Sequence, residues 1–317
     1  MMQGVEPPHV VIGFDGSEAA ERAIRAAARL LPAARATIVV VRESWLPLES
    51  ASAARIALPD SVVEPATRAL DAELEHAAED LLARGRALAP GAAAEIEVAR
   101  SPWRGLVAAA ARLEAAALVC GASGRGGLPR AVLGTTTDAV LHHAPVPVLV
   151  IPEGEPEEGP LVLGYDGSAG SRAAIAEAAT LFPGRPALVV HAWSSPVRRS
   201  FAGMQLLETP VDEVQQLARS LDDMYAGDAE ELAEEGAALA RDAGLEAQAG
   251  TVESGRGVWR AIAALADERG AAAIAVGSRG RGAMKAAVLG SVSSGLVHNA
   301  RRPVLVSGAT ASAERPG

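Results

Sequence analysis

Two glycine-rich stretches of the chain share one spacing. GASGRGGLPRAVLGTTTDA, at residues 121–139, contains Gly-x2-Gly-x9-Gly-Thr, and GSRGRGAMKAAVLGSVSSG, at residues 277–295, contains Gly-x2-Gly-x9-Gly-Ser. Glycines let backbone N–H groups approach an oxyanion and adopt positive φ, and a helix start supplies unpaired N–H groups with partial positive charge. Basic residues in both stretches add charge. The repeated spacing therefore predicts an anion-binding cradle in each half of the chain.

An aspartate closes an apolar run upstream of each glycine loop. Asp15 follows VVIGF and Asp166 follows LVLGY, and each is followed by Gly-Ser. In an open parallel sheet, ligands bind beyond the carboxyl ends of the strands, where the strand order reverses. If one ligand uses both features, the first and fourth strands of each half must be neighbours. We therefore expect the strand order 3-2-1-4-5.

The elements that must position these residues also occur twice. VVIGFDGSEAAERAIRAAARLLP at 10–32 matches LVLGYDGSAGSRAAIAEAATLFP at 161–183, and APVPVLVIP at 144–152 matches ARRPVLVSG at 300–308. The polar stretch EGEPEEGP between the copies is typical of a linker. The sequence predicts a first domain at 1–152, a linker at 153–160, a second domain at 161–308 and a flexible tail at 309–317.

Apolar runs alternate with helical patterns in both halves. Strands are predicted near 9–14, 36–42, 94–99, 116–121 and 146–151, and near 161–165, 186–192, 246–252, 272–277 and 303–307. Helices are predicted near 17–31, 64–89, 102–115 and 135–143, and near 168–181, 212–243, 256–269 and 291–299. Strands that are apolar throughout indicate helices on both faces of a parallel sheet. Each half is therefore predicted to be an α/β domain with five parallel strands.

Several helix starts carry the residues that favour them. Ser17 and Ser168 are predicted as N-caps, and Pro65 and Pro102 are predicted in first turns.

The usual nucleotide and hydrolase signatures are missing. There is no G-x-x-x-x-G-K-[ST] loop, no G-x-G-x-x-G after either first strand and no G-x-S-x-G elbow. The aspartate together with the complete G-2x-G-9x-G-[ST] motif in both halves instead resembles the universal stress proteins, in their tandem two-domain form. The resemblance covers nearly the whole chain. It implies a Rossmann-like fold of strand order 3-2-1-4-5, ATP with Mg²⁺ in each half, and a role in the stress response.

The resemblance also implies the residues of each site. The aspartates would contact the nucleoside, the glycine loops would hold phosphate, and the adenine would lie at the end of the second strand. The ATP-binding residues expected in the first domain are Gly13, Asp15, Val41, Gly121, Ser123, Gly124, Arg125, Gly126, Gly134, Thr135 and Thr136. Those expected in the second domain are Gly164, Asp166, His191, Gly277, Arg279, Gly280, Arg281, Gly282, Gly290, Ser291, Val292 and Ser293.

Composition limits the partners. The chain carries 29 Lys and Arg against 39 Asp and Glu, a net charge of -10, which disfavours broad nucleic-acid binding. The one cysteine, Cys120, is expected to be a buried structural thiol in a reducing compartment. No apolar run reaches the ~18 residues of a membrane span. We expect a cytoplasmic protein with no membrane partner, no nucleic-acid partner and no metal held by a side-chain cluster.

Three functions remain open from the sequence. The favoured one is a regulatory ATP-binding module. Its expected partners are ATP, a second copy of the chain in a homodimer, and a regulatory protein. The second is an enzyme, either a slow ATPase or an adenylyl-transferring ATP pyrophosphatase. The pyrophosphatases carry S-G-G-x-D-[ST] after the first strand, where this chain has FDGSEA and YDGSAG. The third is an interaction scaffold with vestigial glycine loops. No residue is predicted to be catalytic.

Overall fold

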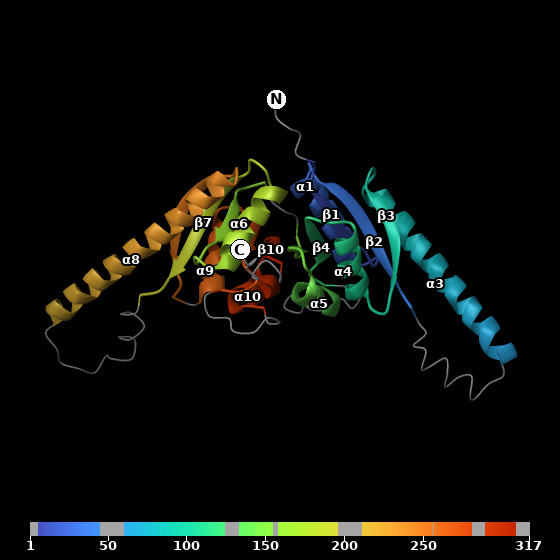
Figure 1. Ribbon diagram of the computed structural model, residues 1–317. Coiled ribbons are helices and arrows are strands. Elements are labelled where there is room, and N and C mark those ends of the chain that lie inside the picture. Colours follow the sequence, from blue (N-terminus) through green and yellow to red (C-terminus); the bar gives the residue numbers. More distant parts are fainter. Residues whose placement is uncertain are drawn as a thin grey trace, which may run out of the picture. The chain divides into compact units, whose positions relative to one another are not determined.

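The computed structural model divides the chain into two compact units, Met1–Glu153 and Gly154–Gly317, and each is treated by itself below (Figure 1). The structure describes residues 6–44, 60–123, 133–154, 158–195, 211–255, 257–280 and 289–308. The predicted tail at 309–317 and residues 155–157 of the predicted linker lie outside these ranges.

Unit 1 is a parallel sheet covered by helices on both faces. Its strands are β1 (His9–Gly13), β2 (Arg35–Glu43), β3 (Ala93–Ala99), β4 (Ala117–Gly121) and β5 (Val148–Ile151), in the order β3-β2-β1-β4-β5. Its helices are α1 (Glu18–Leu30), α3 (Asp60–Leu88), α4 (Pro102–Arg112) and α5 (Thr135–His143). Helices α1 and α3 contact each other over one face of the sheet, and α4 and α5 contact each other over the opposite face.

Unit 2 repeats this arrangement. Its strands are β6 (Leu161–Gly164), β7 (Pro186–Trp193), β8 (Glu246–Glu253), β9 (Ala273–Val276) and β10 (Val304–Val306), all parallel and in the order β8-β7-β6-β9-β10. Its helices are α6 (Ala169–Leu181), α8 (Val211–Asp242), α9 (Val258–Glu268) and α10 (Ser291–Asn299). The predicted fold class and strand order are confirmed in both units.

The central strands are buried on both faces. In β1, the successive residues Val10, Val11 and Ile12 are at most 1 % exposed, so side chains on both sides of the strand lie in the core. A strand of a one-sided sheet would instead alternate buried and exposed positions. The small side chains of α1, Ala19, Ala23 and Ala27 among them, allow the helix to lie close to the sheet.

The helix starts agree with the sequence, with one exception. The Ser17 hydroxyl accepts a hydrogen bond from the N–H of Ala20, and the Ser168 hydroxyl accepts one from the N–H of Ser171. The prediction for Pro65 is wrong, because α3 begins at Asp60 and Pro65 lies inside the helix. As the sixth residue of α3, Pro65 lies beyond the four N–H groups that lack a partner in any helix, so it removes one hydrogen bond, to the carbonyl of residue 61, and the helix continues past it.

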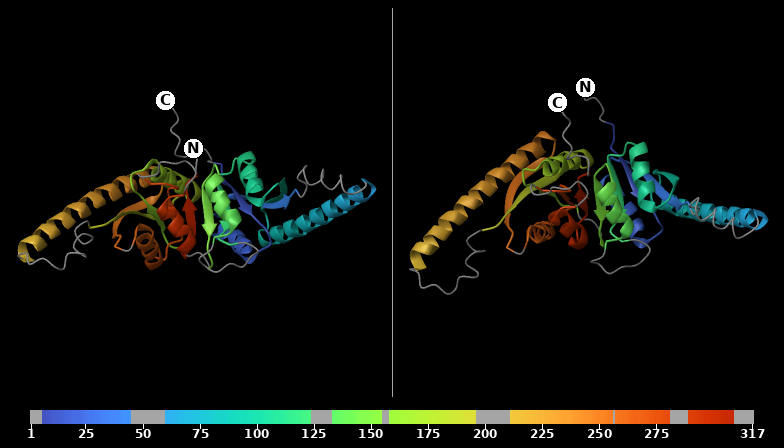
Figure 2. Two further views of the ribbon diagram at one scale, coloured as in Figure 1. Left: turned by 90° about the horizontal axis from the view of Figure 1, so that it is seen from below. Right: turned by 60° about the horizontal axis from the view of Figure 1, so that its bottom comes forward.

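Helices α3 and α8 are much longer than the strands they cover, at 29 and 32 residues. In Figures 1 and 2, the amino-terminal part of each helix extends beyond the sheet of its own unit. Within the described residues, neither these helices nor any other is long and apolar enough to cross a membrane.

Candidate functional site

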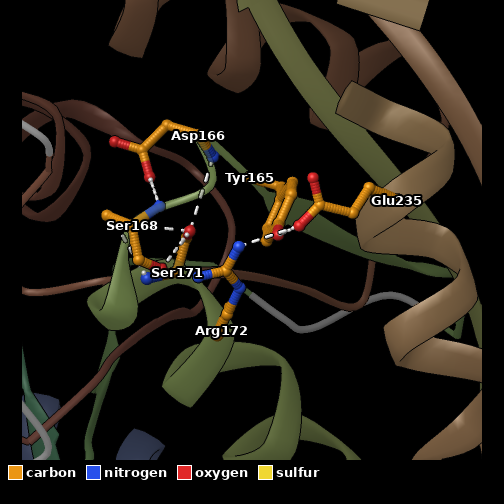
Figure 3. Close-up of polar contacts among 6 residues, drawn as sticks. All are labelled: Tyr165, Asp166, Ser168, Ser171, Arg172 and Glu235. Carbon is orange, nitrogen blue, oxygen red and sulfur yellow. Dashed lines mark hydrogen bonds and ion pairs between the residues drawn. The ribbon is translucent and has the colours of Figure 1, made fainter. Parts of the chain in front are cut away.

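A tight turn holds the aspartate at the end of the first strand of each unit. The Asp15 Oδ1 accepts a hydrogen bond of 3.0 Å from the N–H of Ser17, and Gly16 between them has a φ of +82°. The Asp166 Oδ1 accepts an equal bond of 3.0 Å from the N–H of Ser168 (Figure 3). The left-handed conformation that glycine allows lets the chain pass from the strand into the helix while the carboxylate stays at the strand end.

The glycine loop ends in a helix start beside the same sheet edge. In unit 1, the N–H of Gly134 donates to the carbonyl of Ala122 (2.8 Å), and the Thr137 hydroxyl donates to the carbonyl of Gly121 (2.8 Å). Two hydrogen bonds therefore fasten the first turn of α5 to the end of β4. The backbone N–H groups of that turn point out of the helix start, where an anion would bind.

Unit 2 builds the same closure from different side chains. The N–H of Gly290 donates to the carbonyl of Ser278 (2.8 Å), and the Ser293 hydroxyl donates to the same carbonyl (3.0 Å). A Cβ on Gly280 would lie 2.7 Å from Oδ2 of Asp166. The glycine loop and the aspartate of unit 2 therefore touch, as the strand order requires.

The described glycines of the loops do not have positive φ, and two of them lie against helix backbone. Gly134 and Gly290 both have a φ of -65°, so the expectation of positive φ is wrong at these two positions. A Cβ on Gly121 would lie 2.7 Å from the carbonyl carbon and oxygen of Ala19, and one on Gly277 would lie 2.6 Å from the carbonyl carbon of Gly170. The first glycine of each motif is therefore required because the start of α1 or α6 lies against it.

A cavity of about 360 Å³ in unit 1 joins the aspartate, the end of β2 and the glycine loop. Eight of the predicted residues line it, namely Gly13, Asp15, Val41, Gly121, Ser123, Gly134, Thr135 and Thr136. The other three predicted residues of this domain, Gly124, Arg125 and Gly126, lie outside the described residues.

The sequence interpretation missed the apolar walls of this cavity. They are formed by Phe14, Val39, Val40, Leu81 and Leu106, and further lining comes from Ala20, Glu43, Pro102, Cys120 and Thr137. Phe14 and Val40 adjoin predicted residues, so the strand pattern could have indicated them. Nothing in the helical pattern of α3 or α4 distinguishes Leu81 or Leu106 from the other apolar positions of those helices.

Cys120 lies in the wall of the cavity but is fully buried. Burial, with a smaller effect of the Asp15 charge, raises the pKa of its thiol to about 12. Because the thiolate is the nucleophile, this group is chemically inert at neutral pH. The prediction of a buried thiol is confirmed.

The predicted residues of unit 2 lie along the equivalent sheet edge. His191 lines a separate cavity of about 650 Å³ between the end of β7 and α8. The others with described positions end or follow β6, follow β9, or cap and begin α10, namely Gly164, Asp166, Gly277, Arg279, Gly280, Gly290, Ser291, Val292 and Ser293. Arg281 and Gly282 lie outside the described residues.

Polar contacts connect the aspartate turn of unit 2 to α8 (Figure 3). The Tyr165 hydroxyl donates to Oε1 of Glu235 (2.6 Å), and the Arg172 guanidinium donates to the same oxygen (2.8 Å). Burial and the Glu235 carboxylate raise the pKa of Tyr165. In unit 1, the guanidinium of Arg84 instead donates to the carbonyl of Gly16 (3.3 Å) and to Glu21 (3.1 Å). The sequence interpretation missed these contacts, because they join residues more than sixty positions apart.

Fold and site together define a tandem protein of two Rossmann-like α/β domains, in which an aspartate and a glycine loop meet at the carboxyl edge of each sheet. Comparison with known sequences gives the family. The profile of the universal stress protein family matches residues 8–152 and again residues 159–307, and the chain therefore belongs to that family.

Relatives support this assignment. A universal stress protein from Mycobacterium tuberculosis is 32 % identical over 205 residues, which cover 61 % of this chain and 62 % of the relative, so the match spans less than two thirds of that protein. Another from the same species is 28 % identical over 326 residues, covering 97 % of this chain and 98 % of the relative. The crystal structure of a universal stress protein from Archaeoglobus fulgidus has the same fold, with a TM-score of 0.58 at 18 % identity over 95 % of this chain and 98 % of that one.

Proposed function

We propose that the chain binds ATP, one molecule in each unit, and acts as a regulatory nucleotide-binding module of the cytoplasm. The observation that carries this proposal is the unit 1 cavity, in which Asp15, the end of β2 and the start of α5 face one space. Its volume of about 360 Å³ is within the range of small-molecule sites. The buried, reduced Cys120 is consistent with a reducing compartment.

The two ends of this cavity suit the two ends of a nucleotide. At one end, the first turn of α5 offers backbone N–H groups and the hydroxyls of Thr135 and Thr136 to phosphate oxygens. At the other end, Phe14, Val40 and Leu81 form apolar walls for a planar base. Asp15 also lines this cavity, where its carboxylate would accept hydrogen bonds from ribose hydroxyls.

The cavity wall supports binding better than rapid hydrolysis. Its acidic residues are Asp15 and Glu43, and the described part of the wall contributes no histidine or lysine. No cluster of three metal-ligating side chains occurs among the described residues. Mg²⁺ would therefore arrive bound to the phosphate oxygens, with Asp15 as the neighbouring carboxylate. We propose that the occupied state is read by a protein partner.

The test places a negative charge at each phosphate end. Thr136→Glu and Val292→Glu put a carboxylate in the first turn of α5 or α10, where it favours the helix but repels phosphate. Purified protein is denatured, and the released nucleotide is identified and counted by mass spectrometry. We expect about two ATP per wild-type chain, about one for each single variant and almost none for the double variant.

Thr136→Gln and Val292→Gln are the matched controls, because they have the same shape without the charge. They should keep most of the nucleotide, and calorimetric titration of the emptied proteins with Mg-ATP should give the same stoichiometries. A wild-type chain that carries no ATP and does not bind it in calorimetry would overturn the proposal. So would glutamate variants that retain full occupancy.

A further inference from the structure

The two units can be compared residue by residue at the nucleoside end of the proposed sites. Gly13 pairs with Val39 across β1 and β2, and Gly164 pairs with Val190 across β6 and β7. The next residue of the second strand is therefore Val40 in unit 1 and His191 in unit 2. An apolar side chain and an imidazole occupy the same place.

The long helices are aligned by their glycines. Gly85 of α3 lies against Phe14, and Gly236 of α8 lies against Tyr165, so these two glycines are equivalent. Leu81 in unit 1 then corresponds to Leu232 in unit 2.

The unit 2 cavity therefore lies at the nucleoside end of its site. Three of its lining residues, His191, Ser194 and Leu232, are the equivalents of Val40, Glu43 and Leu81, which all line the unit 1 cavity. The unit 1 cavity continues to the glycine loop. A nucleotide with its phosphates at that loop would place its base at the Val40 end.

The hydrogen bond of His191 determines what the imidazole can offer a ligand. Nδ1 lies 2.8 Å from the carbonyl oxygen of Tyr165. A carbonyl only accepts, so the proton of the neutral ring is on Nδ1, and Nε2 is an acceptor. No described residue forms a hydrogen bond with Nε2.

The rest of the cavity wall is also rich in acceptors. Asp228, Glu231 and Glu235 contribute carboxylates from α8, and Trp193 adds an aromatic surface. The equivalent wall of unit 1 is formed largely by Phe14, Val40 and Leu81. One nucleoside subsite is therefore polar, with donors from Trp193, Ser194 and Tyr225 beside these acceptors, and the other is largely apolar.

We propose that the unit 2 site selects nucleotides whose base carries an exocyclic amino group, with His191 as the specificity-determining residue, and that the unit 1 site does not. The inference rests on the proposed function and extends it. The amino group of adenine donates to Nε2 of His191, whereas the oxygen at the same position of hypoxanthine would place one acceptor against another. A site that hydrogen-bonds a group rejects its isostere far more strongly than an apolar pocket does.

The experiment compares ATP with inosine triphosphate at one site at a time. The chain with Thr136→Glu keeps the unit 2 site, and the chain with Val292→Glu keeps the unit 1 site. Calorimetric titration of each nucleotide-free protein with both Mg-nucleotides gives the ratio of dissociation constants. We expect a preference for ATP of about tenfold or more at the unit 2 site and of about threefold or less at the unit 1 site.

Two substitutions of His191 assign the selectivity. In the chain that keeps the unit 2 site, His191→Val installs the unit 1 residue and should reduce the ratio to that of unit 1. His191→Gln retains an acceptor and should restore part of it. A purely structural role for His191 would weaken both nucleotides equally and leave the ratio unchanged.

The outcomes separate the two proposals. Equal binding of ATP and inosine triphosphate at the unit 2 site, or a ratio that His191→Val does not change, would overturn this inference and leave the proposed function intact. Failure of both nucleotides to bind the wild-type chain would overturn the proposed function, and the inference with it.

Discussion

Glu235 accepts a hydrogen bond of 2.8 Å from Arg172, at the position where unit 1 has the same ion pair with its charges exchanged. There Arg84 of α3 donates to Glu21 of α1 at 3.1 Å. Both pairs join the helix after the first strand to the long helix, next to the aspartate turn. The geometry is conserved between the two units while the sign of each partner is not.

Reversing the unit 2 pair should therefore be tolerated only when both partners change. Glu235→Arg alone places two guanidinium groups together and removes the acceptor of the Tyr165 hydroxyl. Adding Arg172→Glu reproduces the arrangement of unit 1. Because both side chains are about half exposed, at 51 % and 47 %, the coupling energy should be about 0.2–1 kcal/mol. A double-mutant cycle of urea unfolding measures it, and additive effects would contradict the prediction.

Replacing the first glycine of either motif should destabilise its unit. Gly121→Ala and Gly277→Ala put a Cβ within 2.7 Å and 2.6 Å of helix backbone, which cannot move aside as a side chain can. We expect a loss of about 1–3 kcal/mol in the free energy of unfolding.

Gly227→Ala is the control for these variants. Gly227 lies within α8, and a Cβ added there would have no other atom within 4 Å. Alanine at this position should therefore stabilise the helix by about 0.5–1 kcal/mol. Chemical unfolding measures all three variants. If Gly121→Ala left the free energy of unfolding unchanged, the start of α1 would not constrain the loop.

Glu177 should make the stability of unit 2 depend on pH. Burial raises the pKa of this carboxyl to about 7, and its Oε2 has no hydrogen-bond partner among the described residues. Since the folded pKa lies above the ordinary value of 4.5, the folded state binds the proton more tightly and ionisation costs stability. The cost grows as the pH rises from about 4.5 to about 7 and is constant above that.

Glu177→Gln removes this titration. Its stability relative to the wild type should therefore increase over that pH range and level off near pH 8. Urea unfolding at a series of pH values tests this. A difference between the two proteins that does not vary with pH would show that the carboxyl is not perturbed.

Cys120 should resist thiol reagents in the folded protein. With a pKa of about 12, only about one thiol in ten thousand is ionised at pH 8, and the group is buried as well. Alkylation by iodoacetamide, followed by mass spectrometry, should be at least about a hundredfold slower in buffer than in urea. Comparable alkylation rates in the two conditions would mean that the carboxyl end of β4 opens readily in the folded protein.

Much of the site could be predicted because parallel strands share one carboxyl edge. Once the repeat established the order of strands and helices, Asp15 and the loop after β4 had to meet, and the structure places them around one cavity. The strand order followed from that same requirement. Why the first position of the motif must be glycine could not be predicted, because the motif does not reveal which backbone lies beside Gly121.

The sequence by itself determined the duplication, the alternation of strands and helices and the spacing of the glycine loops, since these depend on residues close together in the chain. Only the tertiary structure decided which side chains of α3 and α8 face the site. Leu81, Arg84 and Glu235 reach it because of how each long helix is rotated against its sheet. That rotation depends on packing between distant segments, such as Gly85 against Phe14 and Gly236 against Tyr165, which no local pattern records.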